Sequence, residues 1–344
     1  MTPPEPAADH RPVRTLSVPT TELMDALADA SPNVDVVFWD FQDVPDGVDP
    51  SELDAAVLPY AGDAVVLPPT HQPDLAGAFA GATGLKLVHT QSTGYDGVVD
   101  LVGPDVAIAT AAGVHAAATA ELAVGLALAS LRGIDDAVRQ QSDGVWRSAR
   151  YPGLADRRVL LVGVGGIGAE IGRRLETFDT VLTRVGGTAR DDHQGHVHAG
   201  TELVDLAPHH DVVIVITPLT ESTHGLVGRD VLAALPDGAL VVNVARGAVV
   251  DTEALTREVV SGRLRAALDV VDPEPLPAGH PLWSAPGAII TPHNGGNTAA
   301  FPPRILALLR RQISVLGEGG EPLNLVQQGP WGRRSAGRTL KPSR

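Results

Sequence analysis

The sequence contains no cysteine, which excludes disulfide bonds, thiolate chemistry and a cysteine-based zinc site. Basic residues are in the minority, since 26 Lys and Arg face 41 Asp and Glu and leave a net charge of −15. This charge disfavours nucleic acid and other polyanionic partners. Long apolar runs are also scarce: "AAATAELAVGLALASL" carries Glu121 and is too short to span a membrane, and segment 1–15 lacks the apolar stretch of a signal peptide. We therefore expect a cytoplasmic protein that binds neither membrane nor nucleic acid.

The 344 residues, 44% of them hydrophobic, are enough for two domains. Short apolar runs alternate with helix-like stretches throughout, which predicts βαβ units and parallel sheets. A largely apolar helix, expected over 116–141, divides two such series and reads as the connection between the domains. The strands expected before it are 33–39, 63–69, 85–91 and 106–111, and those expected after it are 158–164, 180–185, 211–217, 239–245, 266–271 and 288–291. The fold class is therefore α/β, with two doubly wound parallel sheets.

The segment "RVLLVGVGGIGAEIGRRLETF" places Gly163, Gly165 and Gly168 directly after a strand and directly before an amphipathic helix. Three glycines at this spacing allow a tight turn, a close approach of the backbone to a pyrophosphate, and close packing of the helix on the strand. Because strand, turn and helix signals all occur together, we interpret the segment as a dinucleotide-binding turn rather than a structural one.

The next expected strand, "TVLTRV", lacks the acidic residue that would hold the adenosine ribose of NAD. It continues instead into Val185, Gly186 and Gly187, with Arg184 and Arg190 on either side of the turn. Arginine is suited to a 2′-phosphate, so we favour NADP as the cofactor, with NAD as the alternative. Both arginines could also be ordinary solvated surface charges.

Chemically distinctive residues follow several strands of the second series. Arg246 comes after "LVVNV", Glu274 lies in "DPEP" beyond "AALDVV", and His293 follows "AIITP". Since ligands of open parallel sheets lie beyond the carboxyl ends of the strands, the three side chains can meet next to a bound nicotinamide. Taken singly, Arg246 could cap a helix, Glu274 could be a surface residue and His293 a buried structural histidine.

Together the three residues fit the reduction of a 2-oxo acid. The fork of Arg246 would hold the substrate carboxylate, and His293 would protonate the forming alkoxide. Glu274 would orient the imidazole ring and favour its protonated form. The sequence therefore predicts a catalytic site built from Arg246, Glu274 and His293.

The segments "NVARGAVVD" (243–251), "ALDVVDPEPLP" (267–277) and "TPHNGG" (291–296) resemble signature segments of the D-isomer-specific 2-hydroxyacid dehydrogenases, including glyoxylate/hydroxypyruvate reductase-like and phosphoglycerate dehydrogenase-like members. The resemblance implies an NAD(P)-dependent oxidoreductase that interconverts a 2-oxo acid and a D-2-hydroxy acid, with Arg246, Glu274 and His293 as its catalytic residues. It also implies that Asp269 lies near the nicotinamide amide and that further cofactor contacts come from Gly166, Ile167, Thr217, Val244, Ala245 and Gly296.

The same resemblance implies a Rossmann-type cofactor domain inserted into a flavodoxin-like substrate domain, and a homodimer formed largely by the cofactor domain. We expect the cofactor domain at 116–297, the substrate domain at 15–115 plus 298–326, and disorder over 1–14 and 327–344. The segment "HTQSTGYD" corresponds to the substrate loop of the family, so Ser92, Thr93 and Gly94 are expected to offer donors to the substrate carboxylate. A second wall of the substrate site is expected at Pro68 and Pro69.

Other interpretations stay open at this point. One is a dinucleotide-binding sensor or corepressor-like scaffold without significant turnover, and another is a homocysteine hydrolase-like or alanine dehydrogenase-like enzyme, which would leave "NVARG" and "PEPLP" unexplained. His193, His196 and His198 cluster in a polar stretch that reads as a solvated loop, so we expect no metal. His115 is expected to cap the connecting helix or to form an interdomain hydrogen bond.

Overall fold

The computed structural model describes residues 12–42, 49–60 and 74–335. The chain divides into two compact units, Met1–Val114 with Ala299–Arg344, and His115–Thr298. The domain bounds expected from the sequence, 116–297 for the inserted domain, differ from this division by one residue at each end. The strand expected at 63–69 and the wall at Pro68 and Pro69 lie outside the described residues.

The first unit is built on a six-stranded sheet in the order β14-β5-β4-β3-β1-β2. All neighbours are parallel except β14, which runs antiparallel to β5. The five parallel strands follow the order 2-1-3-4-5, which is the flavodoxin-like arrangement that the family resemblance implied. The strands are β1 (Thr15–Val18), β2 (Asp35–Phe38), β3 (Ala55–Val57), β4 (Leu87–His89), β5 (Ala107–Ala109) and β14 (Leu325–Gln327).

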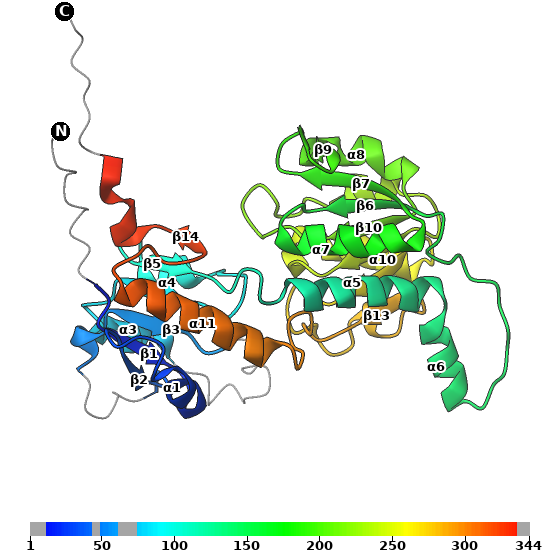
Figure 1. The fold of residues 1–344 in the computed structure, drawn as a ribbon. Helices are drawn as coiled ribbons and strands as arrows, with labels where there is room; N and C mark the ends of the chain where they lie inside the picture. The colour runs from blue at the N-terminus through cyan, green and yellow to red at the C-terminus, as the bar shows by residue number, and fades with distance from the viewer. Residues whose placement is uncertain (1–11, 43–48, 61–73, 336–344) are drawn as a thin grey trace, which may run out of the picture. The chain divides into compact units, whose positions relative to one another are not determined.

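Helices pack on both faces of this sheet, and each face has its own apolar core. One core joins α11 to β1 and β3 through residues such as Leu309, Ile313 and Leu16, and the other joins α3 to β3 and β4 through Ala56 and Val88. In Figure 1 the chain's end returns to its beginning, because the orange α11 and the red β14 lie beside the blue and cyan elements. The helices of this unit are α1 (Thr21–Leu27), η1 (Pro50–Glu52), α3 (Leu75–Gly81), α4 (Val98–Val102), α11 (Phe301–Gly317) and η8 (Gly329–Ser335).

The second unit is built on an eight-stranded sheet in the order β13-β12-β11-β10-β6-β7-β9-β8. The order reverses between β6 and β10, as in a Rossmann fold, and only β8 at the edge is antiparallel. This confirms the predicted α/β fold class. The strands are β6 (Arg158–Val162), β7 (Val181–Gly186), β8 (Arg190–Asp192), β9 (Gly195–Ala199), β10 (Val212–Val215), β11 (Leu240–Asn243), β12 (Arg265–Leu268) and β13 (Ala288–Ile290).

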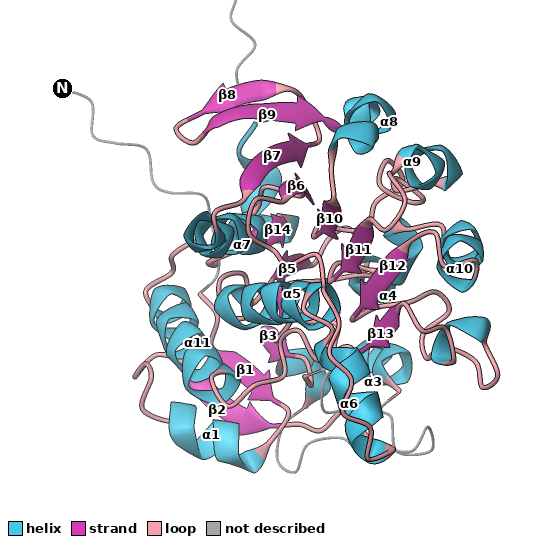
Figure 2. Ribbon diagram, turned by 90° about the vertical axis from the view of Figure 1, so that its right-hand side faces the viewer, coloured by secondary structure: helices cyan, strands magenta, loops and turns pink. Residues whose placement is uncertain are grey.

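Alternate residues of the central strands enter two separate cores, because successive side chains of a strand point to opposite faces. On β10, Val212 and Ile214 face α5 and α7, whereas Val213 and Val215 face α8, α9 and α10. Figure 2 shows these helices on opposite sides of the sheet. The helices are α5 (Ala116–Leu131), α6 (Ile134–Ser142), α7 (Gly166–Leu175), η3 (Glu176–Phe178), η4 (Gly200–Glu202), α8 (Leu203–Leu206), η5 (Ala207–His209), α9 (Arg229–Ala234), η6 (Gly247–Val249), α10 (Thr252–Val260) and η7 (Pro281–Trp283).

The single helix predicted for 116–141 is wrong, since α5 and α6 meet at a bend of 65°. Gly133 between them has φ 61° and ψ 33°, and a Cβ there would come within 2.1 Å of the Tyr151 ring. A glycine in the left-handed region ends the first helix and lets the chain turn. Within the described residues no single helix has the length and composition of a membrane span, and the bent pair α5 and α6 meets that test by length and composition only.

The predicted bounds of disorder need correction at both ends. At the N-terminal end, Val13 is buried and the Arg14 amide donates to Asp54 Oδ2 at 2.6 Å. At the other end, β14 and η8 are ordered as far as Ser335, because Gln327 Nε2 donates to the carbonyls of Gly103 and Val106. Residues 1–11 and 336–344 lie outside the described part of the chain.

Candidate active site

The glycine turn after β6 has the close contacts that its sequence predicts. Gly163 adopts φ 118°, and a Cβ there would lie 2.3 Å from the carbonyl oxygen of Ile216 at the end of β10. A Cβ on Gly168 would lie 2.0 Å from the Gly163 carbonyl oxygen, so only glycine lets α7 pack this close to the strand. These two positions bring the N-terminus of α7 to the reversal in strand order.

Space for a pyrophosphate exists on the outer side of this turn. A Cβ on Gly165 or Gly166 would meet no atom within 4 Å, so the backbone there is open to a close approach. Gly165 is the N-cap residue of α7, so no side chain at this position bonds to the amides of the first turn. The positive end of the helix dipole, at Gly166 and Ile167, favours a phosphate there. The local geometry fits a dinucleotide cofactor.

Asp269 follows β12 directly, is 3% exposed and holds the loop after β13. Its Oδ1 accepts hydrogen bonds from Thr291 Oγ1 at 2.6 Å and from the Asn294 amide at 2.8 Å, and its Oδ2 accepts from the Gly295 amide at 2.8 Å. Its carbonyl oxygen accepts from the His293 amide at 2.9 Å. The sequence missed this role, which is to fix the backbone on both sides of the histidine.

His293 sits in this loop with φ 52°, a left-handed conformation that is uncommon for a residue with a side chain. Its Nδ1 lies 2.5 Å from Oε1 of Glu274, which comes from the loop after β12. Both side chains remain about 40% exposed, with 42% for His293 and 40% for Glu274. The structure therefore brings together the histidine and the glutamate that the sequence predicted as partners.

The electrostatics of the pair favour a charged carboxylate. Partial burial raises the pKa of Glu274, but the hydrogen bond and the charge of His293 act in the opposite direction and prevail. The Val271 backbone and the Arg246 charge add to this effect, so the pKa of Glu274 lies below its usual value. The guanidinium of Arg246 therefore lies within electrostatic reach of the pair.

Arg246 follows β11 in a turn that is braced by Asn243, a residue only 1% exposed. Asn243 Nδ2 donates to the Arg246 carbonyl at 3.0 Å, and its Oδ1 accepts from the Ala245 amide at 3.1 Å. The next residue, Gly247, lies against the loop after β12, and a Cβ on Gly247 would be 1.9 Å from the Val271 carbonyl oxygen. Asn243 and Gly247 were not among the predicted site residues, although both belong to the "NVARG" segment.

The remaining predicted cofactor contacts lie along the same edge of the sheet, because the strands before them are parallel. Val244 and Ala245 are buried at the end of β11, and Thr217 is half-buried after β10. The Gly296 carbonyl lies 3.4 Å from Nδ1 of His115 within the same unit. His115 is the N-cap residue of α5 but makes no side-chain cap hydrogen bond, so of the two roles expected for it the side-chain cap is wrong.

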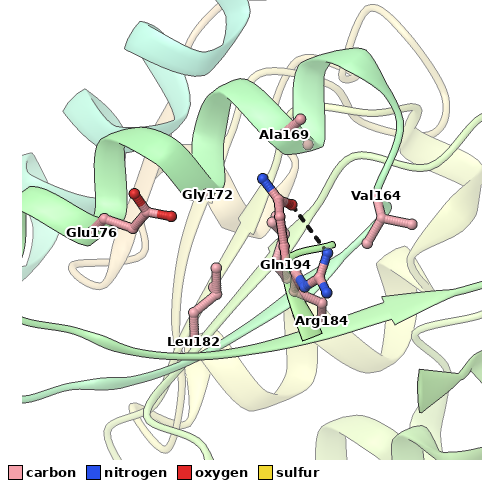
Figure 3. Close-up of a pocket in the computed structure, with 9 residues that line it drawn as sticks. Val164, Ala169, Gly172, Glu176, Leu182, Arg184 and Gln194 are labelled. Atoms are coloured by element: carbon pink, nitrogen blue, oxygen red, sulfur yellow. Dashed lines mark hydrogen bonds between the residues drawn. The ribbon is translucent and has the colours of Figure 1, made fainter. Parts of the chain in front are cut away.

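The two arginines near the end of β7 are placed very differently. Arg184 is 8% exposed, and its guanidinium faces Asp192 with N–O distances of 2.7 and 3.0 Å. For Arg184, therefore, the alternative of an ordinary solvated surface charge does not hold. Arg190 is exposed, and its Nη1 lies 3.1 Å from the position of a Cβ on Gly186. Figure 3 shows Arg184 between β7 and α7, hydrogen-bonded to Gln194, in a pocket that Val164 and Ala169 also line.

The histidine cluster lies in a β-hairpin, so the loop predicted for it is wrong. Strands β8 and β9 pair there, His196 Nδ1 lies 2.9 Å from Asp191 Oδ1, and His198 Nδ1 lies 2.8 Å from Glu202 Oε2. Among the described residues, no group of three or more His, Asp or Glu side chains could hold a metal ion.

The segment expected to contact the substrate carboxylate lies in the first unit, after β4. Ser92 Oγ donates to the Gly94 carbonyl at 2.7 Å, and the Ser92 carbonyl accepts from Thr90 Oγ1 and from the Ala111 amide. Thr93 Oγ1 is buried without a hydrogen-bond partner. These contacts fix the shape of the turn within its own unit.

Comparisons with known proteins agree with this geometry. The profile of the family described as "D-isomer specific 2-hydroxyacid dehydrogenase, NAD binding domain" matches residues 124–295. The human glyoxylate reductase/hydroxypyruvate reductase is 31% identical over 71% of this chain and 77% of its own length. A glyoxylate reductase from Thermofilum pendens is 32% identical over 72% of this chain and 76% of its own length.

Solved structures show the same fold. A D-isomer specific 2-hydroxyacid dehydrogenase from Xanthobacter autotrophicus Py2, crystallised with NADPH and MES, is 28% identical and has a TM-score of 0.75 over 91% of this chain and 98% of its own. The profile match, the identities and the site geometry lead to one conclusion: the chain belongs to the D-isomer specific 2-hydroxyacid dehydrogenase family and is an NAD(P)-dependent oxidoreductase.

Proposed function

We propose that the protein interconverts a 2-oxo acid and a D-2-hydroxy acid, with His293 as the acid and base, Glu274 as its partner and Arg246 as the binder of the substrate carboxylate. The observation that carries this proposal is the 2.5 Å contact between His293 Nδ1 and Glu274 Oε1, with the Arg246 charge acting on the same carboxylate. The three residues follow parallel strands, so they lie on the ligand-binding edge of the sheet.

The roles follow from the contacts. Because Nδ1 of His293 faces Glu274, Nε2 is the nitrogen that can reach a substrate oxygen. In reduction, imidazolium gives its Nε2 proton to the carbonyl oxygen, and the neighbouring carboxylate stabilises the imidazolium until then. A reduced nicotinamide, when bound, would supply the hydride for this reduction. Arg246 holds the substrate carboxylate through a two-pronged hydrogen bond and so orients the carbonyl toward His293.

We also propose that NADP is preferred over NAD. Gly186 stands at the end of β7 where a ribose-binding carboxylate would be expected, and the Nη1 atom of Arg190 lies beside it. A guanidinium at this point can pair with a 2′-phosphate but gives a ribose hydroxyl no acceptor.

Two finer proposals concern substrate and partners. The turn containing Ser92, Thr93 and Gly94 is proposed to donate to the substrate carboxylate. A second copy of the chain is proposed as a partner, because the exposed apolar side chains of Val138 and Trp146 lie on α6 and the segment after it, with Trp146 fully exposed. Light scattering of the purified protein tests the dimer, and cell fractionation tests the expected cytoplasmic location.

The experiment that tests the proposed reaction is a panel of 2-oxo acids offered with NADPH and with NADH. Loss of nicotinamide absorbance with at least one small 2-oxo acid, and formation of the D-hydroxy acid on a chiral column, is the expected result. A protein that binds the cofactor but turns over none of the panel, or that forms the L-hydroxy acid, would contradict the proposal.

A further inference from the structure

The hairpin of β8 and β9 is joined to β7 by the backbone pairing of β9 with β7, and a buried guanidinium also holds its turn and the end of β8. Besides its two contacts with Asp192, Arg184 donates to Gln194 Oε1 at 3.0 Å and to the Gly195 carbonyl at 2.8 Å. All of these acceptors belong to the end of β8, the turn or the start of β9. Charge-assisted, two-pronged contacts of this kind are directional, so they fix the turn relative to the strand.

Arg190 lies on the same face of the hairpin as the atoms that Arg184 holds. In β8, Arg190 and Asp192 are two residues apart and therefore point to the same side. Arg190 is opposite Val197, and Val197 is opposite Arg184 on β7, so the three residues form one row across the sheet. The position of Arg190 beside Gly186 thus depends on how the hairpin is held.

We propose that the ion pair between Arg184 and Asp192 is a positioning device for cofactor selection, which holds β8 so that Arg190 meets the 2′-phosphate of NADP. Arg184 acts through Asp192 and the hairpin and does not bind the phosphate itself. The inference rests on the proposed preference for NADP, and it replaces the direct phosphate contact that the sequence suggested for Arg184.

The surroundings of Arg184 argue against a direct contact. Its guanidinium is nearly buried, and both of its terminal nitrogens already donate to the carboxylate of Asp192. The side chain of Arg190 is exposed and stands two residues from that carboxylate. Arg184 therefore also neutralises a negative charge that would otherwise repel the phosphate.

The two roles predict opposite results for Asp192→Asn. If Arg184 positions the hairpin, the substitution loosens β8 and lowers the ratio of kcat/KM for NADPH to that for NADH by roughly tenfold, because one charge-assisted contact to the phosphate is lost. If Arg184 were a direct ligand, the substitution would release its guanidinium, and the ratio would stay the same or rise. A rise or an unchanged ratio would overturn the proposal.

A matched control comes from the same sheet. Asp211 also forms a two-pronged pair with an arginine, Arg158, with N–O distances of 2.8 and 3.1 Å. Arg158 begins β6, so this pair lies at the amino ends of the strands, opposite to the cofactor turn. Asp211→Asn removes a two-pronged pair with a more exposed arginine and is expected to leave the cofactor ratio unchanged. Thermal unfolding of both variants shows whether either has lost the fold.

Arg190→Ala separates this inference from the proposed function. If the unmodified protein does not prefer NADPH, the proposed preference is wrong, and the inference falls with it. If Arg190→Ala abolishes a preference that Asp192→Asn leaves intact, only the positioning role is wrong. The double variant should match Arg190→Ala alone, since Asp192 is expected to act through Arg190, and a further drop in the ratio would contradict this.

Calorimetric titration with NADP⁺ and NAD⁺ provides a second measurement that does not depend on turnover. Asp192→Asn should weaken binding of NADP⁺ by the same roughly tenfold factor and leave NAD⁺ unchanged. If that variant does not fold, Gln194→Ala can replace it, because this substitution removes a neutral contact to Arg184. It should lower the affinity for NADP⁺ relative to NAD⁺ by a smaller factor. Equal loss of affinity for both cofactors would point to general damage and overturn the proposal.

Discussion

The imidazole of His293 and the carboxylate of Glu274 come from loops that follow different strands, and they meet at 2.5 Å between Nδ1 and Oε1. His293→Ala removes the proposed proton donor. We expect turnover with the best 2-oxo acid to fall by about 10² to 10⁴, while cofactor affinity stays near that of the unmodified protein. His209→Ala, at an exposed histidine of the same unit, is the control and should retain full activity. Near-normal turnover of His293→Ala would end the assignment.

Glu274→Gln tests the electrostatic part of the pair. The lowered pKa of Glu274 means that the carboxylate is charged at neutral pH and stabilises the imidazolium. Without the carboxylate, kcat/KM for reduction should fall by about tenfold, because the charge-assisted hydrogen bond to the imidazolium is lost. Unchanged kcat/KM in Glu274→Gln would show that Glu274 does not assist His293.

Arg246→Lys keeps a positive charge but removes the two-pronged fork. We expect the KM for the 2-oxo acid to rise and kcat to fall, with a combined loss in kcat/KM of at least about tenfold, because one charge-assisted hydrogen bond is lost. Cofactor affinity should be unaffected. Arg257→Lys on the surface of α10 is a suitable control. Unchanged kinetics for Arg246→Lys would mean that Arg246 serves the structure of its turn rather than the substrate.

Thr291→Val removes the 2.6 Å hydrogen bond to Asp269 Oδ1 and keeps nearly the same shape. The loop that carries His293 in its left-handed conformation should lose about 1.5 to 3 kcal/mol of stabilisation, because the acceptor is a charged carboxylate. We expect a large fall in kcat and only small changes in the KM values for the 2-oxo acid and for the cofactor. Thr256→Val removes a hydroxyl hydrogen bond of equal length, 2.6 Å to the Thr252 carbonyl, away from the site. Equal effects of the two substitutions on kcat would argue against a positioning role for Thr291.

Much of the site could be predicted from the sequence because its residues follow apolar strands. In parallel sheets, that position alone brings Arg246, Glu274 and His293 to one edge. The glycine turn was also predictable, because its strand, turn and helix signals are contiguous. The contacts that hold these residues could not be predicted, since Asn243, Asp269 and Thr291 act through hydrogen bonds that depend on the exact approach of neighbouring loops.

Several elements that the sequence missed give only a weak apolar signal. Strand β1 reads "TLSV" and alternates polar with apolar residues, and strand β3 reads "AAV" and consists mostly of alanine. Strand β8 reads "RDD" and has no apolar alternation, and it is held by pairing with β9 and by the contact of Asp192 with Arg184. The break at Gly133 was hidden because one glycine in an apolar helical pattern is often tolerated.

His89, at the end of β4, should make the first unit sensitive to acid. The side chain is 1% exposed, and neither ring nitrogen meets hydrogen-bond geometry. Burial lowers the pKa of His89 from 6.5 to about 4, against a smaller opposing effect of the Thr90 backbone. The folded unit therefore keeps the ring neutral where the unfolded chain would protonate it.

The sign of the effect follows from this difference. Between pH 6.5 and about 4 the unfolded state binds more protons than the folded state, so the stability present above pH 6.5 is lost as pH falls through this range. From pH 7 to pH 5 the loss attributable to His89 should be about 2 kcal/mol. Hydrogen exchange at the β4 amides measures the opening free energy at both values. His89→Leu should show a loss smaller by that amount, whereas the exposed His209→Leu should behave like the unmodified protein. If His89→Leu loses as much stability as the unmodified protein between the two pH values, then His89 is not the neutral buried group that its surroundings indicate.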